Sequence, residues 1–215
     1  MQYRSSGFSD MPPVVKNLLI INVVVWIAQV FLRKQGIYFL DEYAALNPIN
    51  SGLFKVWQLI TYMFMHASVN QYGGIEFFHI FFNMFTLWMF GRILENFWGS
   101  KRFLQFYIIC GIVAGATHLL ATPDASAVGA SGAIMGLMAG FTYLFPNTEL
   151  YLMFLPFPIK AKYLIPGFMA LDLFGGVTKT QGDNVAHWAH LGGALAGIII
   201  VIIWNKSKTN RRNFY

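Results

Sequence analysis

Residues 125–148 read ASAVGASGAIMGLMAGFTYLFPNT, an uncharged interval in which Ser131 lies between Gly129-Ala130 and Gly132-Ala133. A helix that crosses the hydrocarbon core of a bilayer needs about 20 mostly apolar residues, and this interval has that length and composition. Four further intervals also lack charged side chains: 17–32, 77–91, 103–123 and 184–205. Together the five intervals predict an all-α membrane protein.

The composition of the whole chain supports this interpretation. Of its 215 residues, 56% are hydrophobic and only 11% are charged, whereas soluble domains carry about 25% charged residues. A water-soluble globule of this size is therefore excluded, and the apolar content excludes a disordered chain. Cys110 is the only cysteine, which excludes a disulfide within the chain and a cysteine-rich metal cluster.

A sixth and weaker apolar interval, residues 163–178, contains Pro166 and Asp172. Charge asymmetry decides whether it is a span, because the cytoplasmic loops of membrane proteins are rich in lysine and arginine. With six spans and the N-terminus inside, 11 of the 15 basic residues face the cytoplasm. The net charge of +6 then reflects membrane topology, and nucleic acid is not expected as a partner.

We therefore expect one domain over residues 1–215, with both termini inside. Its predicted spans are residues 14–33, 77–94, 102–121, 131–146, 163–178 and 185–205, and an outer loop covers 35–76. The first apolar run is a full-length span without a small-residue cleavage site, so it is not expected to be a signal peptide. The lack of an organellar targeting segment favours a bacterial inner (plasma) membrane.

Polar side chains occur near the start of three of these spans. His79 and Asn83 begin the second, Ser131 begins the fourth, and His187 and His190 begin the sixth. In the predicted topology all three spans run from outside to inside, so at 1.5 Å per residue these groups lie within roughly 10 Å of the outer ends. Polar groups inside spans are costly and mark functional sites, so we expect them to meet at one depth.

Small residues predict which helices approach each other. The fourth span has Gly132 and Gly136, and the sixth has Gly193 and Gly197. This GxxxG spacing lets the backbones of two membrane helices come close together. We expect the fourth and sixth spans to pack against each other, which brings the serine within reach of a histidine.

This arrangement predicts nucleophilic catalysis. A serine hydroxyl attacks efficiently only when a base takes its proton, and a neutral imidazole within hydrogen-bond reach is such a base. Ser131 is the predicted nucleophile and His190 the predicted base, with His187 as a second candidate base. No membrane-embedded carboxylate has a suitable spacing, and Asp172 and Asp183 are expected at the interface, so a dyad is predicted.

A tetrahedral oxyanion needs hydrogen-bond donors aimed at it. His79 and Asn83 are four residues apart and so share one face of a helix, where their side chains can supply such donors. Ser131 lies at a helix start, where backbone N–H groups have no partner within the helix.

Three motifs carry a resemblance to a known family. They are Gly129-Ala130-Ser131-Gly132, His79-Ile-Phe-Phe-Asn83 and Ala189-His190-Leu-Gly-Gly193-Ala-Leu-Ala-Gly197. On alternate spans, they resemble the GxSG, HxxxN and AHxxGxxxG motifs of the rhomboid intramembrane serine proteases. Two further segments are similar to the family, Gly91 to Gly99 and Asp172 to Gly175.

The resemblance implies a bundle of six transmembrane helices and a serine endopeptidase that cleaves transmembrane protein substrates near their outer ends. It also implies an oxyanion hole made by the His79 and Asn83 side chains and the Ser131 backbone N–H. No cofactor is implied, and the expected partners are transmembrane substrates and the lipid bilayer. The chain departs from the family at Gln58, because an arginine often follows the tryptophan found here as Trp57.

Other interpretations are a non-catalytic rhomboid-like membrane chaperone or binding protein, and a small transporter. The first usually lacks the serine or the histidine, and the second is disfavoured because no inverted repeat is visible. A zinc site is not expected, because the sequence has no HExxH pair and no carboxylate at the required depth. His66 and His118 are expected at the interface, and Cys110 as a small buried hydrophobe.

Overall fold

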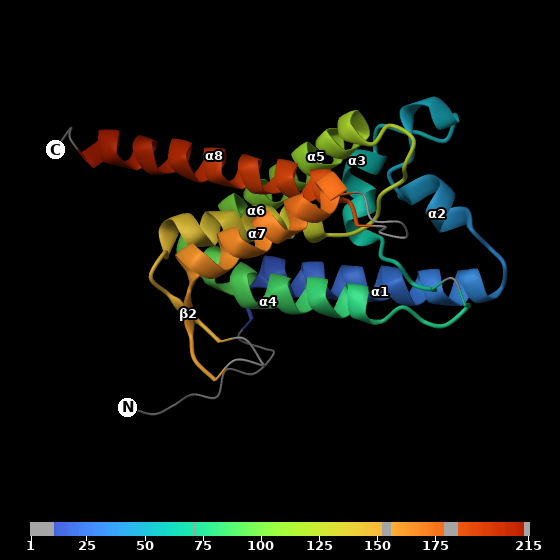
Figure 1. Ribbon diagram of the computed structural model, residues 1–215, viewed down its shortest axis with the longest axis horizontal. Helices are drawn as coiled ribbons and strands as arrows, with labels where there is room; N and C mark the ends of the chain where they lie inside the picture. Colours follow the sequence, from blue (N-terminus) through green and yellow to red (C-terminus); the bar gives the residue numbers. More distant parts are fainter. Residues whose placement is uncertain (1–10, 71, 152–155, 179–184, 213–215) are drawn as a thin grey trace.

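In the computed structural model the chain is mostly helical (Figure 1). The structure describes residues 11–70, 72–151, 156–178 and 185–212. The long helices in these ranges are α1 Pro13–Lys34, α4 Phe78–Trp98, α5 Ser100–Ala121, α6 Ser131–Leu144, α7 Ala161–Thr178 and α8 His187–Arg212. Each one coincides with a predicted span, including α7, which continues through Pro166.

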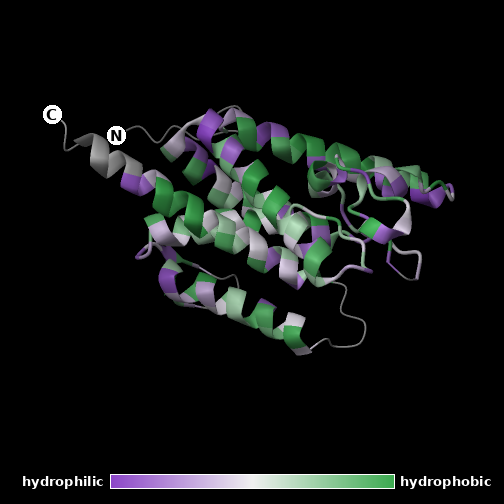
Figure 2. Ribbon diagram, turned by 90° about the horizontal axis from the view of Figure 1, so that it is seen from above, coloured by the Kyte–Doolittle hydropathy of each residue, from purple (hydrophilic) through white to green (hydrophobic). Residues whose placement is uncertain are grey.

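Among the described residues, three helical segments are long and apolar enough to cross a membrane: α1, α5 and His187–Lys206 of α8. Figure 2 shows hydrophobic residues along the outer faces of the long helices. On α1, for example, Val24, Ile27 and Phe31 are more than half exposed. Extended apolar surface of this kind fits contact with lipid, and the chain is an integral membrane protein.

Helix α6 lies in the middle of the bundle and contacts α4, α5 and α8 (Figure 1). A Cβ atom on Gly193 would collide with the carbonyl oxygen of Gly132, and one on Gly136 would lie 2.6 Å from the Sγ atom of Cys110. The backbones of α6 and α8 therefore touch, as the GxxxG spacing predicts. Cys110 is fully buried, which confirms the prediction of a small buried hydrophobe.

Helix α7 lies at the edge of the bundle, and of its 18 residues only Ala161, Ile165 and Gly176 are buried. The connection from α6 to α7 contains two short antiparallel strands, β1 Glu149–Leu150 and β2 Ile159–Lys160. In the second half of α7 the buried residue is Gly176, which lies against His187 of α8.

The segment predicted as an outer loop, residues 35–76, is folded. It contains the short helices α2 Phe39–Ala44, η2 Ile49–Ser51, α3 Gln58–Thr61 and η3 Tyr62–Phe64. An isolated bridge between Leu46 and Ala127 joins this segment to the turn that leads into α6. The loop therefore helps to position the start of α6.

Gln58 anchors this loop at the position where the usual arginine is missing. Its side-chain oxygen accepts hydrogen bonds from the backbone N–H groups of Asn47 and Lys55, both at 3.2 Å. Its side-chain nitrogen donates to the carbonyl oxygens of Glu42 at 3.1 Å and Leu53 at 3.0 Å. Gln58 is fully buried, so a neutral amide holds the successive turns of the loop together.

Glu95, near the end of α4, caps the N-terminus of α1. Its carboxylate accepts hydrogen bonds from the backbone N–H groups of Val14 (3.0 Å) and Val15 (2.8 Å) and from the Ser100 hydroxyl (2.7 Å). First-turn N–H groups lack partners in their own helix, and negative charge is favoured beside them. Glu95 is 2% exposed, so this buried cap joins α1 to the α4–α5 corner.

Candidate active site

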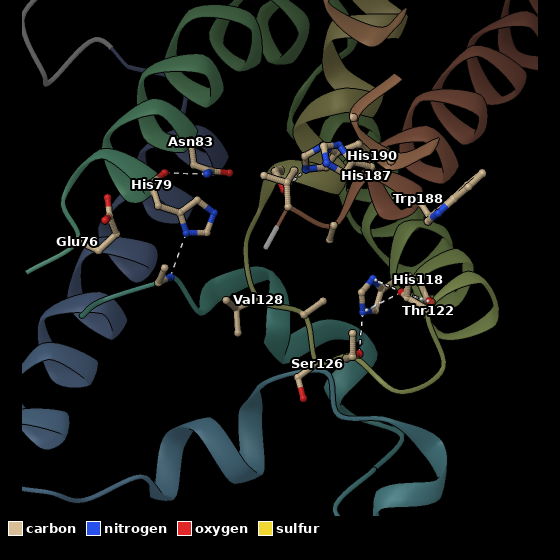
Figure 3. Close-up of a pocket in the computed structure, with 18 residues that line it drawn as sticks. Glu76, His79, Asn83, His118, Thr122, Ser126, Val128, His187, Trp188 and His190 are labelled. Atoms are coloured by element: carbon tan, nitrogen blue, oxygen red, sulfur yellow. Dashed lines mark hydrogen bonds between the residues drawn. The ribbon is translucent and has the colours of Figure 1, made fainter. Parts of the chain in front are cut away.

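The polar residues at the starts of the second, fourth and sixth predicted spans line one cavity. Its volume is about 1000 Å³. The lining includes His79 and Asn83 from α4, Ser131 from α6, and His187 and His190 from α8. Figure 3 shows the two α4 residues facing the two α8 histidines across this cavity. The structure therefore brings together the five residues that the sequence singled out.

Ser131 and His190 are hydrogen-bonded. Ser131 is the first residue of α6, and His190 lies in the first turn of α8. The Oγ atom of the serine lies 2.7 Å from the Nε2 atom of the imidazole, and His190 is only 9% exposed. A hydroxyl and an imidazole in this relationship have the geometry that an activated nucleophile requires.

The turn before α6 places Ser131 against His79. Gly129 has a φ of +128°, which disfavours any residue with a side chain, and its N–H donates to the carbonyl oxygen of Tyr62 at 2.9 Å. A Cβ atom on Gly129 would lie 3.2 Å from the Nε2 atom of His79 and 3.6 Å from the Oγ atom of Ser131. Because Gly129 has no side chain, a space remains that both His79 Nε2 and Ser131 Oγ border.

A backbone hydrogen bond orients the His79 ring. The N–H of Ala67 donates to the Nδ1 atom of His79 at 3.0 Å (Figure 3). Because Nδ1 accepts this bond, a neutral ring carries its proton on Nε2. That nitrogen borders the space beside Gly129 and Ser131, so His79 presents a donor to the cavity.

Asn83 lies one turn after His79 and is 7% exposed. Its side-chain nitrogen donates to the carbonyl oxygen of His79 at 2.8 Å (Figure 3). Its side-chain oxygen has no hydrogen-bond partner within the described part of the chain. An amide nitrogen has two N–H groups, so one of them remains for a ligand in the cavity.

Asp172, which is expected at the interface and is left out of the predicted dyad, contacts both histidines of α8. Its Oδ1 atom lies 2.9 Å from the Nδ1 atom of His190 and 2.9 Å from the Nδ1 atom of His187. The prediction that no suitably placed carboxylate exists is therefore wrong, because carboxylate, imidazole and Ser131 hydroxyl form one hydrogen-bonded chain. The companion residue, Asp183, lies outside the described residues.

The same three side chains have the composition of a metal-binding group. The ligand atoms of Asp172, His187 and His190 all lie within 4.8 Å of one another. Imidazole nitrogens and carboxylate oxygens are common donors to divalent metal ions. The structure thus places beside the two histidines a carboxylate that the sequence does not predict there.

His66 and His118, both expected at the interface, are buried at 0% and 3% exposure. The Nε2 atom of His66 lies 2.9 Å from the Oδ1 atom of Asn22 on α1. Burial lowers the pKa of His66 to about 3, and the neighbouring His79 ring adds to this effect. His118 lines the cavity, and its Nε2 atom lies 2.8 Å from the carbonyl oxygen of Ala125 (Figure 3).

Comparisons with known proteins identify the family of this chain. Rhomboid protein 1, mitochondrial, from Saccharomyces cerevisiae is 29% identical over 178 residues, which cover 72% of this chain and 51% of the relative. Rhomboid-like protein 11, chloroplastic, from Arabidopsis thaliana is 30% identical over 197 residues, which cover 86% and 66%. Presenilin-associated rhomboid-like protein, mitochondrial, from Homo sapiens is 28% identical over 228 residues, which cover 95% and 56%.

The chain thus spans between about half and two thirds of the length of these curated relatives. The family described as "Rhomboid domain" matches residues 53–207, a range that begins in the folded loop and includes α4 to α8 with every residue of the Ser131–His190–Asp172 chain. The protein belongs to the rhomboid family.

Proposed function

We propose that this chain is a serine endopeptidase that cleaves transmembrane protein substrates, with Ser131 as the nucleophile and His190 as the general base. The single observation that carries the proposal is the 2.7 Å distance between Ser131 Oγ and His190 Nε2. This pair borders a cavity whose opposite wall offers hydrogen-bond donors from α4. A binding protein would have no need for a hydroxyl and an imidazole in this relationship.

In the first half of the reaction, the Oγ atom of Ser131 bonds to a substrate carbonyl carbon while its proton passes to Nε2 of His190. The C–N bond then breaks, and the leaving amine takes that proton, which leaves an ester on Ser131 and a neutral imidazole. In the second half, a water oxygen bonds to the ester carbon and its proton passes to Nε2. The serine oxygen leaves with this proton, which releases an acid and restores the starting state.

The negative charge that develops on the carbonyl oxygen needs donors in place before the reaction. His79 offers its Nε2–H, because Ala67 occupies Nδ1. Asn83 offers its second amide N–H, because the first donates to the His79 carbonyl. The backbone N–H of Ser131, in the first turn of α6, is the third proposed donor, since such groups lack partners in their own helix.

Substrates are proposed to be cut near the outer ends of their transmembrane helices. The positions of the six long helices fit six spans in one domain, with both termini inside as the charge asymmetry predicts. The cavity lies at the N-terminal ends of α4, α6 and α8, which this topology places on the outer side. A substrate helix must unwind there before a carbonyl is free, and residues of poor helix propensity ease this step.

The proposed reaction does not depend on a particular cellular membrane. The names of the relatives place them in mitochondria or chloroplasts, so the comparisons give no support to the bacterial inner membrane expected from the sequence. Any membrane with a single-span substrate whose outer end reaches the cavity would serve the proposed reaction.

The test is cleavage of single-span substrates by the protein in liposomes. The wild-type protein is expected to cut, and Ser131→Ala is expected to be inactive while its thermal unfolding midpoint stays unchanged. Ser126→Ala is the matched control, because this serine lines the same cavity but its hydroxyl donates to Asn47 Oδ1 at 3.1 Å. Cleavage by Ser131→Ala at the wild-type rate would refute the proposal.

The position of the cut tests the topology separately. Mass spectrometry of the two products is expected to place it near the outer boundary of the substrate span, after a small residue such as alanine. The space beside Ser131 is narrow, because a single Cβ atom on Gly129 would already approach His79 Nε2 to 3.2 Å. A cut at the cytoplasmic end of the span would contradict the proposed topology.

A further inference from the structure

We propose that Asp172 is a positioning residue that fixes the tautomer of His190, so that the site works as a Ser131–His190–Asp172 chain rather than as a dyad. This inference rests on the proposed function, because it assigns the group that prepares the base of that reaction. The role follows from three features of the structure, namely the hydrogen bonds at one carboxylate oxygen, the donor and acceptor roles of the groups and the packing of α7 on α8.

The first feature is that both histidines of α8 use the same oxygen. Oδ1 of Asp172 lies 2.9 Å from Nδ1 of His187 and 2.9 Å from Nδ1 of His190. The three side chains are 16%, 13% and 11% exposed, in that order. Water therefore competes little for these bonds, and two donors converge on one acceptor.

The second feature is the donor or acceptor role of each group. The carboxylate of Asp172 only accepts hydrogen bonds, so each imidazole Nδ1 that bonds to its Oδ1 atom must carry the hydrogen. A neutral His190 with its hydrogen on Nδ1 has a free lone pair on Nε2, the atom that lies 2.7 Å from Ser131 Oγ.

The opposite tautomer would not serve the reaction. With its hydrogen on Nε2, His190 would donate to Ser131 and leave Nδ1, without a hydrogen, facing a carboxylate oxygen at 2.9 Å. Two acceptors would then meet without a proton between them. Asp172 thus selects the tautomer that accepts the serine proton, and its negative charge stabilises the imidazolium that forms after the transfer.

The third feature is a pair of glycines one turn after Asp172. A Cβ atom on Gly175 would lie 2.8 Å from Cε1 of His187, and one on Gly176 would lie 2.7 Å from Cβ of His187. Positions 172, 175 and 176 share one helix face, so the glycines let this face of α7 lie directly on α8. Without them the helix would stand farther away, and the carboxylate would not reach His190.

A kinetic comparison of Asp172→Asn with Asp124→Asn tests the role. Both variants replace one carboxylate by its amide, but Asp124 is exposed, whereas Asp172 binds the ring of His190. Asp172→Asn is expected to lower kcat on the order of 10²-fold or more with KM unchanged, because a group that fixes a tautomer acts on the chemical step. Asp124→Asn is expected to keep the wild-type kcat, and an equal loss in both variants would overturn the proposal.

A spectroscopic measurement tests the tautomer without relying on cleavage. In protein labelled with ¹⁵N-histidine, the signals of His190, assigned by comparison with His190→Gln, are expected to show a hydrogen on Nδ1 and none on Nε2. Asp172→Glu, which keeps the charge, is expected to retain this tautomer in part, and Asp172→Asn is expected to lose it. A wild-type His190 with its hydrogen on Nε2 would overturn the proposal, even if Asp172→Asn failed to fold.

The two readouts also separate this inference from the proposed function. If wild-type protein cleaved no substrate while the His190 signals showed the expected tautomer, the positioning role would stand and the protease assignment would fail. If the wild-type protein cleaved and Asp172→Asn retained full kcat, the assignment would stand and the positioning role would fail.

Discussion

The N–H of Ala67 lies 3.0 Å from Nδ1 of His79 and donates to it. A residue of loop 35–76 therefore sets the direction of a donor in the cavity. Because Nδ1 accepts this bond, it carries no hydrogen in the neutral ring, and the hydrogen lies on Nε2. The Nε2 atom borders the space beside Ser131. Loop 35–76 therefore affects the site through one backbone contact, although it supplies neither the proposed nucleophile nor the proposed base.

Asn83→Ala is expected to lower the cleavage rate by about 10²–10³-fold, the typical cost of losing one oxyanion donor. The effect is expected to be smaller than that of Ser131→Ala, because His79 still offers its Nε2–H and a backbone N–H remains. Single-turnover cleavage with saturating enzyme measures it. A loss as severe as that of Ser131→Ala would show that Asn83 has a larger role than one of several donors.

His190→Ala is expected to lower cleavage by at least about 10³-fold, as loss of the base does in known serine proteases, while His187→Ala keeps measurable activity. The reason is that His190, not His187, has its Nε2 atom 2.7 Å from Ser131 Oγ. Both variants are compared at equal amounts of folded protein. The reverse ranking would assign the base to His187.

The positions of the helices and the convergence of the polar residues could be predicted, because both depend on the order of residue types along the chain. Uncharged intervals fix where helices lie, and the direction of each span fixes the depth of its first turn. GxxxG spacing then predicted that α6 and α8 touch, and the clash of a Cβ atom on Gly193 with the Gly132 carbonyl confirms it.

The role of Asp172 was missed because depth alone does not give the direction of a side chain. The sequence predicts only its depth within the span, whereas the rotation of α7 about its axis decides whether it faces lipid or α8. Gly175 and Gly176 were the available signal, since both lie on the face of Asp172 and a pair of glycines marks a close helix contact.

His66 and His118 were placed at the interface for a similar reason. Their positions near span ends give the depth, but their burial depends on partners far away in sequence. Asn22 on α1 is 44 residues from His66, and no local pattern connects the two. Pairing of this kind becomes visible only once the loop and α1 are packed together.

Glu95→Gln is expected to destabilise the folded protein by about 2–3 kcal/mol, because a buried charged acceptor is lost from several hydrogen bonds. The amide that replaces the carboxylate turns an N–H toward the backbone donors of Val14 and Val15. Reversible unfolding in mixed micelles measures the change in free energy. Glu149→Gln, on the exposed end of β1, is the control and is expected to leave stability unchanged.

The last prediction concerns acid sensitivity through His66. Its Nε2 atom donates to Asn22 Oδ1, and its Nδ1 atom is buried without a hydrogen-bond partner within the described residues. A proton added to Nδ1 would place an unpaired charged donor in the protein interior. Burial therefore lowers the pKa of His66 to about 3, with a further contribution from His79.

The sign of the effect on stability follows from the proton balance. Above about pH 6.5, the reference pKa of histidine, His66 is neutral in both the folded and unfolded chains, and its stabilising contribution is fully present. As the pH falls below this value, His66 binds a proton in the unfolded chain but not in the folded chain. The free energy of unfolding therefore drops by up to about 1.4 kcal/mol per pH unit until the pKa of the folded state is reached. At pH 5 the expected loss of unfolding free energy is about 2 kcal/mol. It is measured as the fall of the unfolding midpoint between pH 7.5 and pH 5, which is expected to be larger for the wild-type protein than for His66→Gln. Because every other titrating group is common to both proteins, equal falls would show that His66 takes up its proton in the folded state.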